Sequence, residues 1–176
     1  DGKLSILDLS EAKIVEGGSA YISYNGFCQY TYNDRLGYYA FYGCSGLTSL
    51  TIPSGFTSIN NYTFEGCSGL TSLTIPSGVT SIGDKAFYGC SGLTSLTIPS
   101  GVTSIRDYAF KGCSGLTSLT LPSSVTSIGE QTFEGCSGLT SIYVYPENLP
   151  ELGTDIFTGC DAKNCTVYVP KGTYDA

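Results

Sequence analysis

The sequence predicts a solenoid, which we expect to be a right-handed coil of short parallel β-strands joined by short helical turns. The first observation is a repeat of 23 residues, in which the stretch from Cys67 to Gly89 recurs with few changes from Cys44, Cys90 and Cys113. Units of this length stack because one unit cannot bury its own apolar face. The second observation is the alternation of apolar and polar residues within each unit, and the third is the regular return of Pro and Gly. We call each unit a coil.

The four regular coils occupy residues 44–135, and they share one plan. A first strand alternates inward and outward side chains with the period of two that a β-strand requires. Pro76 and Gly78 then turn the chain, a second short strand follows, and residues 84–87 are expected to form one helical turn. We expect Thr71 and Thr74 to be exposed. The residues expected in the core are Leu70, Leu73, Ile75, Val79, Ile82, Ala86, Phe87 and Cys90.

Residues 1–43 are interpreted as an irregular first coil. Leu7 matches Leu50 at a separation of 43 residues, which is one repeat plus an insertion of 20. The insertion contains two aromatic-rich runs around Asn25-Gly26, within residues 20–32. Because Asn-Gly favours the two positive φ angles of a type I′ turn, these runs are predicted to form a β-hairpin.

Residues 136–176 continue the pattern less regularly. Tyr145 is one extra residue, after which Leu152 and Phe157 fall one place late, and Val167 and Val169 begin another strand. The chain contains no Met and ends on an extended segment, so we expect it to be a truncated piece of a longer protein. The unbroken repeat predicts a single domain over residues 1–176.

Five of the eight Cys occupy one position in successive coils, namely Cys44, Cys67, Cys90, Cys113 and Cys136. Their side chains point in parallel rather than toward each other, which disfavours disulfides. We expect a ladder of free buried thiols, and we keep a bridge between Cys160 and Cys165 as an alternative.

Composition excludes several classes of function. The formal net charge is −7 and the basic residues are scattered, so nucleic acid is not an expected partner. No run of residues is apolar enough to enter a membrane. The chain has no His, which removes the usual partner of a catalytic Ser or Cys and the commonest metal ligand. We predict no enzyme, no cofactor and no metal site.

The repeat resembles the BspA-like, or treponemal-type, leucine-rich repeat, which runs Leu-x-x-Leu-x-Ile-Pro-x-x-Val-x-x-Ile-Gly-x-x-Ala-Phe-x-x-Cys. Residues 70–90 follow this pattern throughout. The resemblance implies a secreted or surface-attached bacterial protein without an active site, and adhesion to host proteins, host cells or other microbes as its role.

Two regions depart from the repeat and are candidate binding sites for a host or microbial surface protein or glycan. The hairpin contributes Tyr21, Tyr24, Tyr30 and Tyr32, and the turn edge contributes Tyr62, Tyr88, Arg106 and Tyr108. Tyrosine is favoured where an apolar body and a polar tip are both useful. The alternatives are that the hairpin only caps the first coil, that the turn edge is only a solvated ridge, and that the protein is a spacer or stalk in a larger surface protein.

Overall fold

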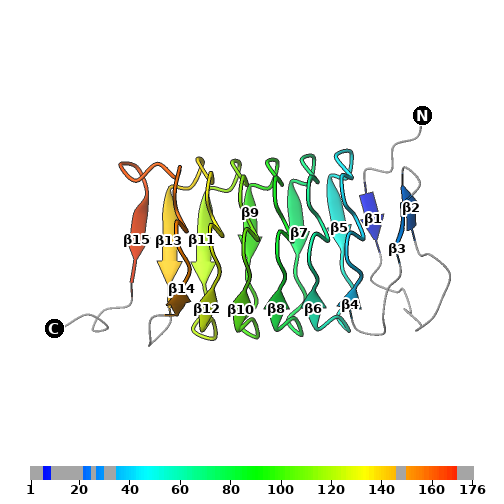
Figure 1. The fold of residues 1–176 in the computed structure, drawn as a ribbon, viewed down its shortest axis with the longest axis horizontal. Coiled ribbons are helices and arrows are strands. Elements are labelled where there is room, and N and C mark those ends of the chain that lie inside the picture. The colour runs from blue at the N-terminus through cyan, green and yellow to red at the C-terminus, as the bar shows by residue number, and fades with distance from the viewer. Residues whose placement is uncertain (1–5, 9–21, 25–26, 30–34, 146–149, 170–176) are drawn as a thin grey trace.

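The computed structural model describes residues 6–8, 22–24, 27–29, 35–145 and 150–169, which form a solenoid of stacked coils (Figure 1). Every regular coil contributes one strand to each of two parallel sheets, as the sequence predicted. The seven-stranded sheet has the order β1 (Ile6–Asp8), β5 (Ser49–Thr51), β7 (Ser72–Thr74), β9 (Ser95–Thr97), β11 (Ser118–Leu121), β13 (Ser141–Val144) and β15 (Thr166–Tyr168). The six-stranded sheet has the order β14 (Glu151–Leu152), β12 (Ser127–Ile128), β10 (Ser104–Ile105), β8 (Ser81–Ile82), β6 (Ser58–Ile59) and β4 (Arg35–Leu36).

The strand register follows the repeat. Leu50 pairs with Leu73 in the first sheet, and Ile59 pairs with Ile82 in the second. Leu7 pairs with Leu50, which confirms the predicted insertion in the first coil. Ile128 pairs with Leu152, which confirms the extra residue in the last coil.

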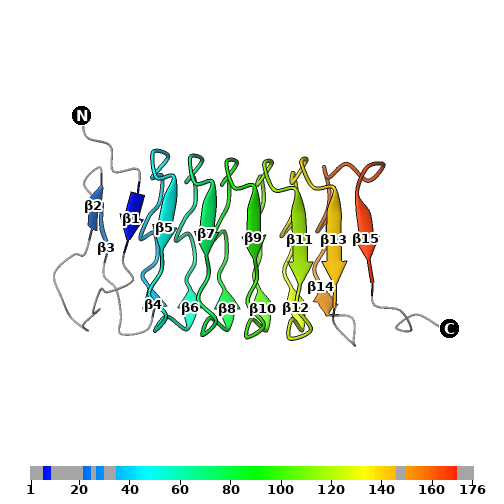
Figure 2. The ribbon, with the colours of Figure 1, turned by 180° about the vertical axis from the view of Figure 1, so that it is seen from behind.

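The insertion contains a hairpin of β2 (Ile22–Tyr24) and β3 (Phe27–Gln29). These strands are antiparallel and Tyr24 pairs with Phe27, which confirms the predicted hairpin. The turn type itself falls on residues 25–26, outside the described residues. Figures 1 and 2 place the hairpin beyond β1, at the N-terminal end of the stack.

The core lies between the two sheets and contains the residues expected there. Thr71 and Thr74 are exposed, and Leu73, Val79 and Phe87 are buried. One phenylalanine per coil forms a stacked column, with ring centroids 5.1 Å to 5.6 Å apart; its members are Phe41, Phe64, Phe87, Phe110, Phe133 and Phe157.

The predicted helical turn at residues 84–87 is wrong, because no segment of the described residues forms a helix. Lys85 has a φ of +51°, which a right-handed helix does not allow. Successive backbone amides of this segment alternate between acceptors in the next coil and acceptors within their own coil. The Lys85 and Phe87 amides donate to the next coil, at 2.9 Å and 2.7 Å, whereas the Tyr88 amide donates to the Lys85 carbonyl within its own coil, at 3.1 Å. The segment is therefore a series of turns tied to the neighbouring coil.

The cysteine ladder is present as free thiols, as expected. The Cys90 Sγ donates to the Phe64 carbonyl at 3.1 Å, and the same bond recurs along the ladder. Cys160 and Cys165 are half-buried free thiols, so the alternative of a bridge between them is not found. Burial raises the pKa of Cys90 to about 12 and that of Cys136 to about 12, which keeps both thiols protonated and unreactive.

Candidate functional site

The turn edge of each coil places one residue in the left-handed region of backbone space. These residues and their φ angles are Tyr39 (60°), Tyr62 (62°), Lys85 (51°), Tyr108 (59°), Gln131 (49°) and Asp155 (56°). Residues other than glycine pay roughly 1–3 kcal/mol for this conformation. The bonds between coils hold it, as when the Tyr62 amide donates to the Asp84 carbonyl at 2.9 Å. The side chains consequently leave each coil at the same place and form a column.

Tyrosines and lysines from this column and from the residues three positions later form one continuous cluster, which we call the tyrosine–lysine ridge. Its members are Tyr39, Tyr42, Tyr62, Lys85, Tyr88, Tyr108 and Lys111. The rings of Tyr39 and Tyr62 stack with centroids 4.6 Å apart and planes 2° from parallel. The ring of Tyr42 meets Tyr39 edge-on at 5.6 Å.

Lys85 lies at the centre of the ridge. Its ammonium group is 5.7 Å from the ring centroids of three residues, Tyr62, Tyr88 and Tyr108. This is within the range of a cation–π interaction, which contributes about 0.5–1 kcal/mol at exposed sites. These contacts join the tyrosines of three successive coils through a single lysine.

Acidic side chains lie close to both lysines of the ridge. Lys111 Nζ lies 2.8 Å from Glu134 and donates to Gln131 Oε1 at 2.7 Å. The hydrogen bond to Glu134 raises the pKa of Lys111. Burial raises the pKa of Glu65, and the nearby charge of Lys85 acts in the opposite direction. The ridge is thus aromatic with balanced charges, rather than a cationic patch.

The N-terminal end of the ridge is the most exposed part. Tyr39 is 40% exposed and Tyr42 46%, and the adjacent Tyr38 is 54% exposed. Tyr62, Tyr88 and Tyr108 are half-buried against their neighbours. Exposed tyrosines held in place by stacking lose little side-chain entropy when a partner binds, which is the condition for an interaction hot spot.

The structure brings together three of the predicted site residues, Tyr62, Tyr88 and Tyr108, through Lys85. Arg106 is exposed but lines a separate groove. Tyr21, Tyr30 and Tyr32 lie outside the described residues, and of Tyr24 only the backbone position in β2 is described. The predictions for the hairpin tyrosines therefore stay predictions.

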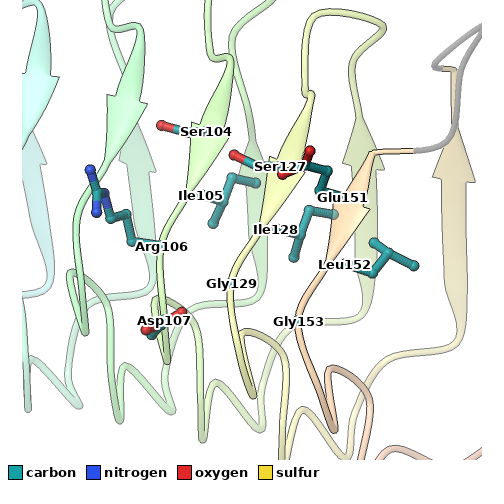
Figure 3. A pocket seen from close by; sticks show the side chains of 10 residues that line it. All are labelled: Ser104, Ile105, Arg106, Asp107, Ser127, Ile128, Gly129, Glu151, Leu152 and Gly153. Atoms are coloured by element: carbon teal, nitrogen blue, oxygen red, sulfur yellow. The ribbon is translucent and has the colours of Figure 1, made fainter.

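The groove beside Arg106 has a volume of about 440 Å³ and runs over β10, β12 and β14 (Figure 3). Its lining includes Ser127 and Gly129, and Figure 3 shows the Arg106 side chain extending away from Gly129, toward the preceding coil. The glycine has a structural reason, because a Cβ there would overlap the Asp107 side chain, which accepts a hydrogen bond from the Glu130 amide at 2.8 Å.

A second repeated surface, the hydroxyl ladder, consists of Thr71, Thr94, Thr117 and Thr140. Each hydroxyl donates to the carbonyl of the threonine one coil earlier, at 3.1 Å to 3.4 Å. The donors are therefore used to join coils. This ladder stabilises the stack and has no donor left over for a specific partner.

The candidate residues predicted from the sequence did not include Tyr38, Tyr39, Tyr42 or Lys85. The signal was the separation of 23 residues between Tyr39 and Tyr62, which equals the repeat and predicts side-by-side placement. The position of Tyr39 in the irregular first coil obscured this signal. The contacts of Lys85 with three rings depend on the turn geometry and could not be read from spacing.

Other kinds of site are not found in the part of the chain that the structure describes. No group of three or more Cys, Asp or Glu residues there is placed to hold a metal ion. Nor is there a helix in that part that could span a membrane.

The sequence matches the model of the BspA type leucine rich repeat region in six copies over residues 34–166. A search of curated proteins found no match.

Among solved structures, the chain is similar to the leucine-rich repeat protein of T. pallidum, with 27% identity and a TM-score of 0.66, covering 78% of this chain and 73% of the other. It is also similar to a leucine-rich cell surface protein of Faecalibacterium prausnitzii, with 26% identity and a TM-score of 0.65, covering 96% of this chain and 48% of the other. The chain thus spans about half the length of the second protein. The pneumococcal vaccine antigen PcpA shares the fold, with 22% identity and a TM-score of 0.63, covering 80% of this chain and 35% of that antigen.

The six repeat copies cover most of the chain, and the two parallel sheets repeat with the same period. This chain belongs to the BspA-type leucine-rich repeat family, whose fold is that of a protein-binding module.

Proposed function

We propose that the chain is a non-enzymatic, extracellular or cell-surface adhesion module that recognises a host or microbial surface protein, cell or glycan through the tyrosine–lysine ridge. The observation that carries the proposal is the exposed end of the ridge, where Tyr38, Tyr39 and Tyr42 gather on one turn. Tyrosine is enriched at the centres of protein interfaces. The similarity to a leucine-rich cell surface protein supports an extracellular location.

The way in which the rings stack indicates how a partner would bind. One face of the Tyr39 ring is covered by Tyr62, and the cation of Lys85 lies over the Tyr62 and Tyr108 rings. The face of the Tyr39 ring that Tyr62 does not cover, the ring edges and the phenol hydroxyls are the groups left to meet a partner. The partner would accept hydrogen bonds from the hydroxyls and pack apolar atoms against the edges.

The test is a binding assay of the folded chain against arrays of matrix proteins and glycans, followed by affinity measurement for each hit. Tyr39→Ser combined with Tyr42→Ser is expected to weaken binding by at least about tenfold, since two lost hot-spot tyrosines exceed 1.4 kcal/mol. Tyr145→Ser is the matched control, because Tyr145 is 52% exposed and lies away from the ridge. Equal affinities for both variants would exclude the ridge as the binding site.

The hairpin tyrosines are a second candidate binding site, and a separate pair of substitutions tests them. Tyr24→Ser with Tyr30→Ser should leave the melting temperature unchanged and abolish binding if the hairpin tyrosines contact the partner. A lower melting temperature with intact binding would identify the hairpin as a cap on the first coil.

A spacer is the second candidate function, and the hydroxyl ladder favours it. Its donors are used between coils, as in the bond from Thr117 to Thr94 at 3.2 Å, which leaves a uniform surface. Uniform failure of the folded chain to bind any probe on the arrays would support the spacer over the adhesion module.

A further inference from the structure

One group on the tyrosine–lysine ridge shows how the turn edge holds a cation. The Lys111 ammonium lies 5.4 Å from the ring centroid of Tyr108 and 2.8 Å from the Glu134 carboxylate. The ring and the lysine belong to one coil, and the carboxylate belongs to the next. An aromatic ring and a carboxylate in this register therefore bind one basic side chain between them.

The same three positions recur near the N-terminal end of the ridge, where the base is absent. Three repeats of 23 residues earlier, the ring position is Tyr39 and the carboxylate position is Glu65, but the lysine position is Tyr42. The backbone matches at the ring position, because Tyr39 has a φ of 60° and Tyr108 one of 59°. This coil thus keeps the ring and the carboxylate and replaces the cation with a second ring.

Glu65 is positioned as Glu134 is, yet no base is paired with it. The Gly43 amide donates to the Glu65 carbonyl at 2.7 Å, and the Gly112 amide donates to the Glu134 carbonyl at 2.8 Å. Within the described part of the chain, the Glu65 carboxylate forms no ion pair and no hydrogen bond. Burial raises its pKa, and the charge of Lys85 opposes this effect from a distance. A cation that reached the carboxylate would replace the hydration that burial removes.

The surroundings of Glu65 favour a cation over other ligands. No Lys or Arg occurs in the sequence between Arg35 and Lys85, and the whole chain has a formal net charge of −7. Tyr39 and Tyr42 are both exposed, and their ring planes meet at 66°. Two aromatic surfaces at an angle therefore face solvent beside the carboxylate position. Aromatic faces attract cations, and the negative charge of the chain attracts a basic partner.

An arginine side chain fits this combination of groups. Its guanidinium is planar, stacks on aromatic rings and donates two parallel hydrogen bonds to a carboxylate, whereas the lysine ammonium is a compact and strongly hydrated charge. We propose that the N-terminal end of the ridge binds an arginine side chain of a protein partner, with the guanidinium against Tyr39 and Tyr42 and paired with Glu65. This inference rests on the proposed function and narrows its partner to a protein that presents an arginine.

The test titrates the folded, isotope-labelled chain with a blocked Gly-Arg-Gly peptide and follows the shifts by NMR. The comparison peptide carries citrulline, the uncharged isostere of arginine. Salt at about 150 mM screens the long-range attraction of the net charge. The arginine peptide should bind with a Kd on the order of 10 mM, with its largest shifts near Tyr39, Tyr42 and Glu65. The citrulline peptide should bind at least about fivefold more weakly, because it lacks the cation.

Two substitutions of glutamate separate a specific contact from general charge attraction. Glu65→Gln should weaken binding of the arginine peptide by about three- to fivefold and leave binding of the citrulline peptide unchanged. Glu151→Gln is the matched control, because it removes the same charge from an exposed side chain in β14. It should leave both Kd values unchanged.

Several results would overturn the proposal. They are equal Kd values for the arginine and citrulline peptides, equal losses in Glu65→Gln and Glu151→Gln, and a Gly-Lys-Gly peptide that binds as tightly as the arginine peptide. The failure of this inference differs from the failure of the proposed function. Array partners that need Tyr39 and Tyr42 but bind equally well to Glu65→Gln would keep the ridge as the binding site and reject the arginine. Expected peptide binding by a chain that binds nothing on the arrays would support the arginine site and count against the adhesion module.

Discussion

The inner coils and the last described coil place apolar residues at matching positions in the same register, yet the burial of these residues is opposite. Phe87 stacks between two rings and is fully buried, whereas Phe157 stacks on one ring and is 40% exposed. Val167 pairs with Ile142 in the sheet but is 56% exposed. The strands pair in the same register in both regions, so the difference in burial arises because no described coil covers the last one.

This comparison shows that the apolar pattern of a coil determines which way its side chains point, and that stacking determines what they contribute to stability. Each inner coil buries its apolar side chains against two neighbours. The last coil obtains half of these contacts. Matched substitutions in the inner coils and in the last coil can therefore separate the effect of side-chain orientation on stability from the effect of stacking between coils.

The largest expected difference is in the response to alkaline pH. Burial raises the pKa of Cys90 and Cys136 to about 12 and places those of Cys67 and Cys113 well above the usual value near 9. Above pH 9 these thiols ionise in the unfolded chain but stay protonated in the folded one, so stability falls as pH rises from 9 toward 12. Each thiol should remove about 1.4 kcal/mol per pH unit from the free energy of unfolding. Urea unfolding in reducing buffer at pH 8, 9 and 10 measures it.

The control for this titration uses single thiols from the two regions. Cys90→Ala should lessen the pH dependence by about 1.4 kcal/mol per pH unit. Cys165→Ala should change it much less, because Cys165 is half-buried in the last coil. Equal effects of the two variants would contradict the comparison.

The next largest difference is expected for the phenylalanine column. Phe87→Ala should reduce the free energy of unfolding by about 3–5 kcal/mol, because it opens a cavity between two stacked rings. Phe157→Ala should cost less than about 1 kcal/mol, because no described ring covers its outer face and no closed cavity forms. Urea unfolding of both variants at neutral pH compares the two losses in the free energy of unfolding. Similar losses would show that the last coil is as well packed as the others.

The smallest difference concerns the hydroxyl ladder. Thr117→Val removes the bond to the Thr94 carbonyl at 3.2 Å and should cost about 0.5–1 kcal/mol, since the shape of the side chain is kept. Thr166→Val in β15 should have almost no effect, because the structure gives the Thr166 hydroxyl no hydrogen bond to the described residues. Thermal unfolding monitored by circular dichroism compares the melting temperatures of the two variants. An unchanged melting temperature for Thr117→Val would show that water replaces the lost hydrogen bond of the ladder.

Periodicity predicted most of the fold because each position of the coil recurs in one environment. The burial of Phe87, the pairing of Leu7 with Leu50 and the hairpin around residues 25 and 26 all follow from spacing. Spacing could not predict the backbone of residues 84–87, where the positive φ of Lys85 and the bonds to the next coil replace helical bonds. Local sequence favoured a helical turn, and contacts between coils overrode it.

The candidate site was less predictable than the fold. Tyr62, Tyr88 and Tyr108 were identified as variable aromatic residues on one edge, but the ridge depends on Lys85 reaching all three. Its most exposed part, around Tyr39, lies where the insertion hides the repeat. Arg106 shares the turn edge in sequence, yet it lines the groove over β10 and β12 instead. Side-chain direction at a turn depends on φ, which the repeat pattern does not encode.

The near-identity of successive interfaces has a consequence for how such a protein can evolve. The rings of Phe64 and Phe87 stack with centroids 5.2 Å apart, and those of Phe87 and Phe110 with centroids 5.1 Å apart, so one coil boundary is interchangeable with the next. Removing or duplicating one 23-residue unit between Gly66 and Gly112 would join surfaces that already fit. Recombination between near-identical gene segments produces such changes in single steps. The reach of the molecule can therefore lengthen or shorten under selection while the core design stays the same.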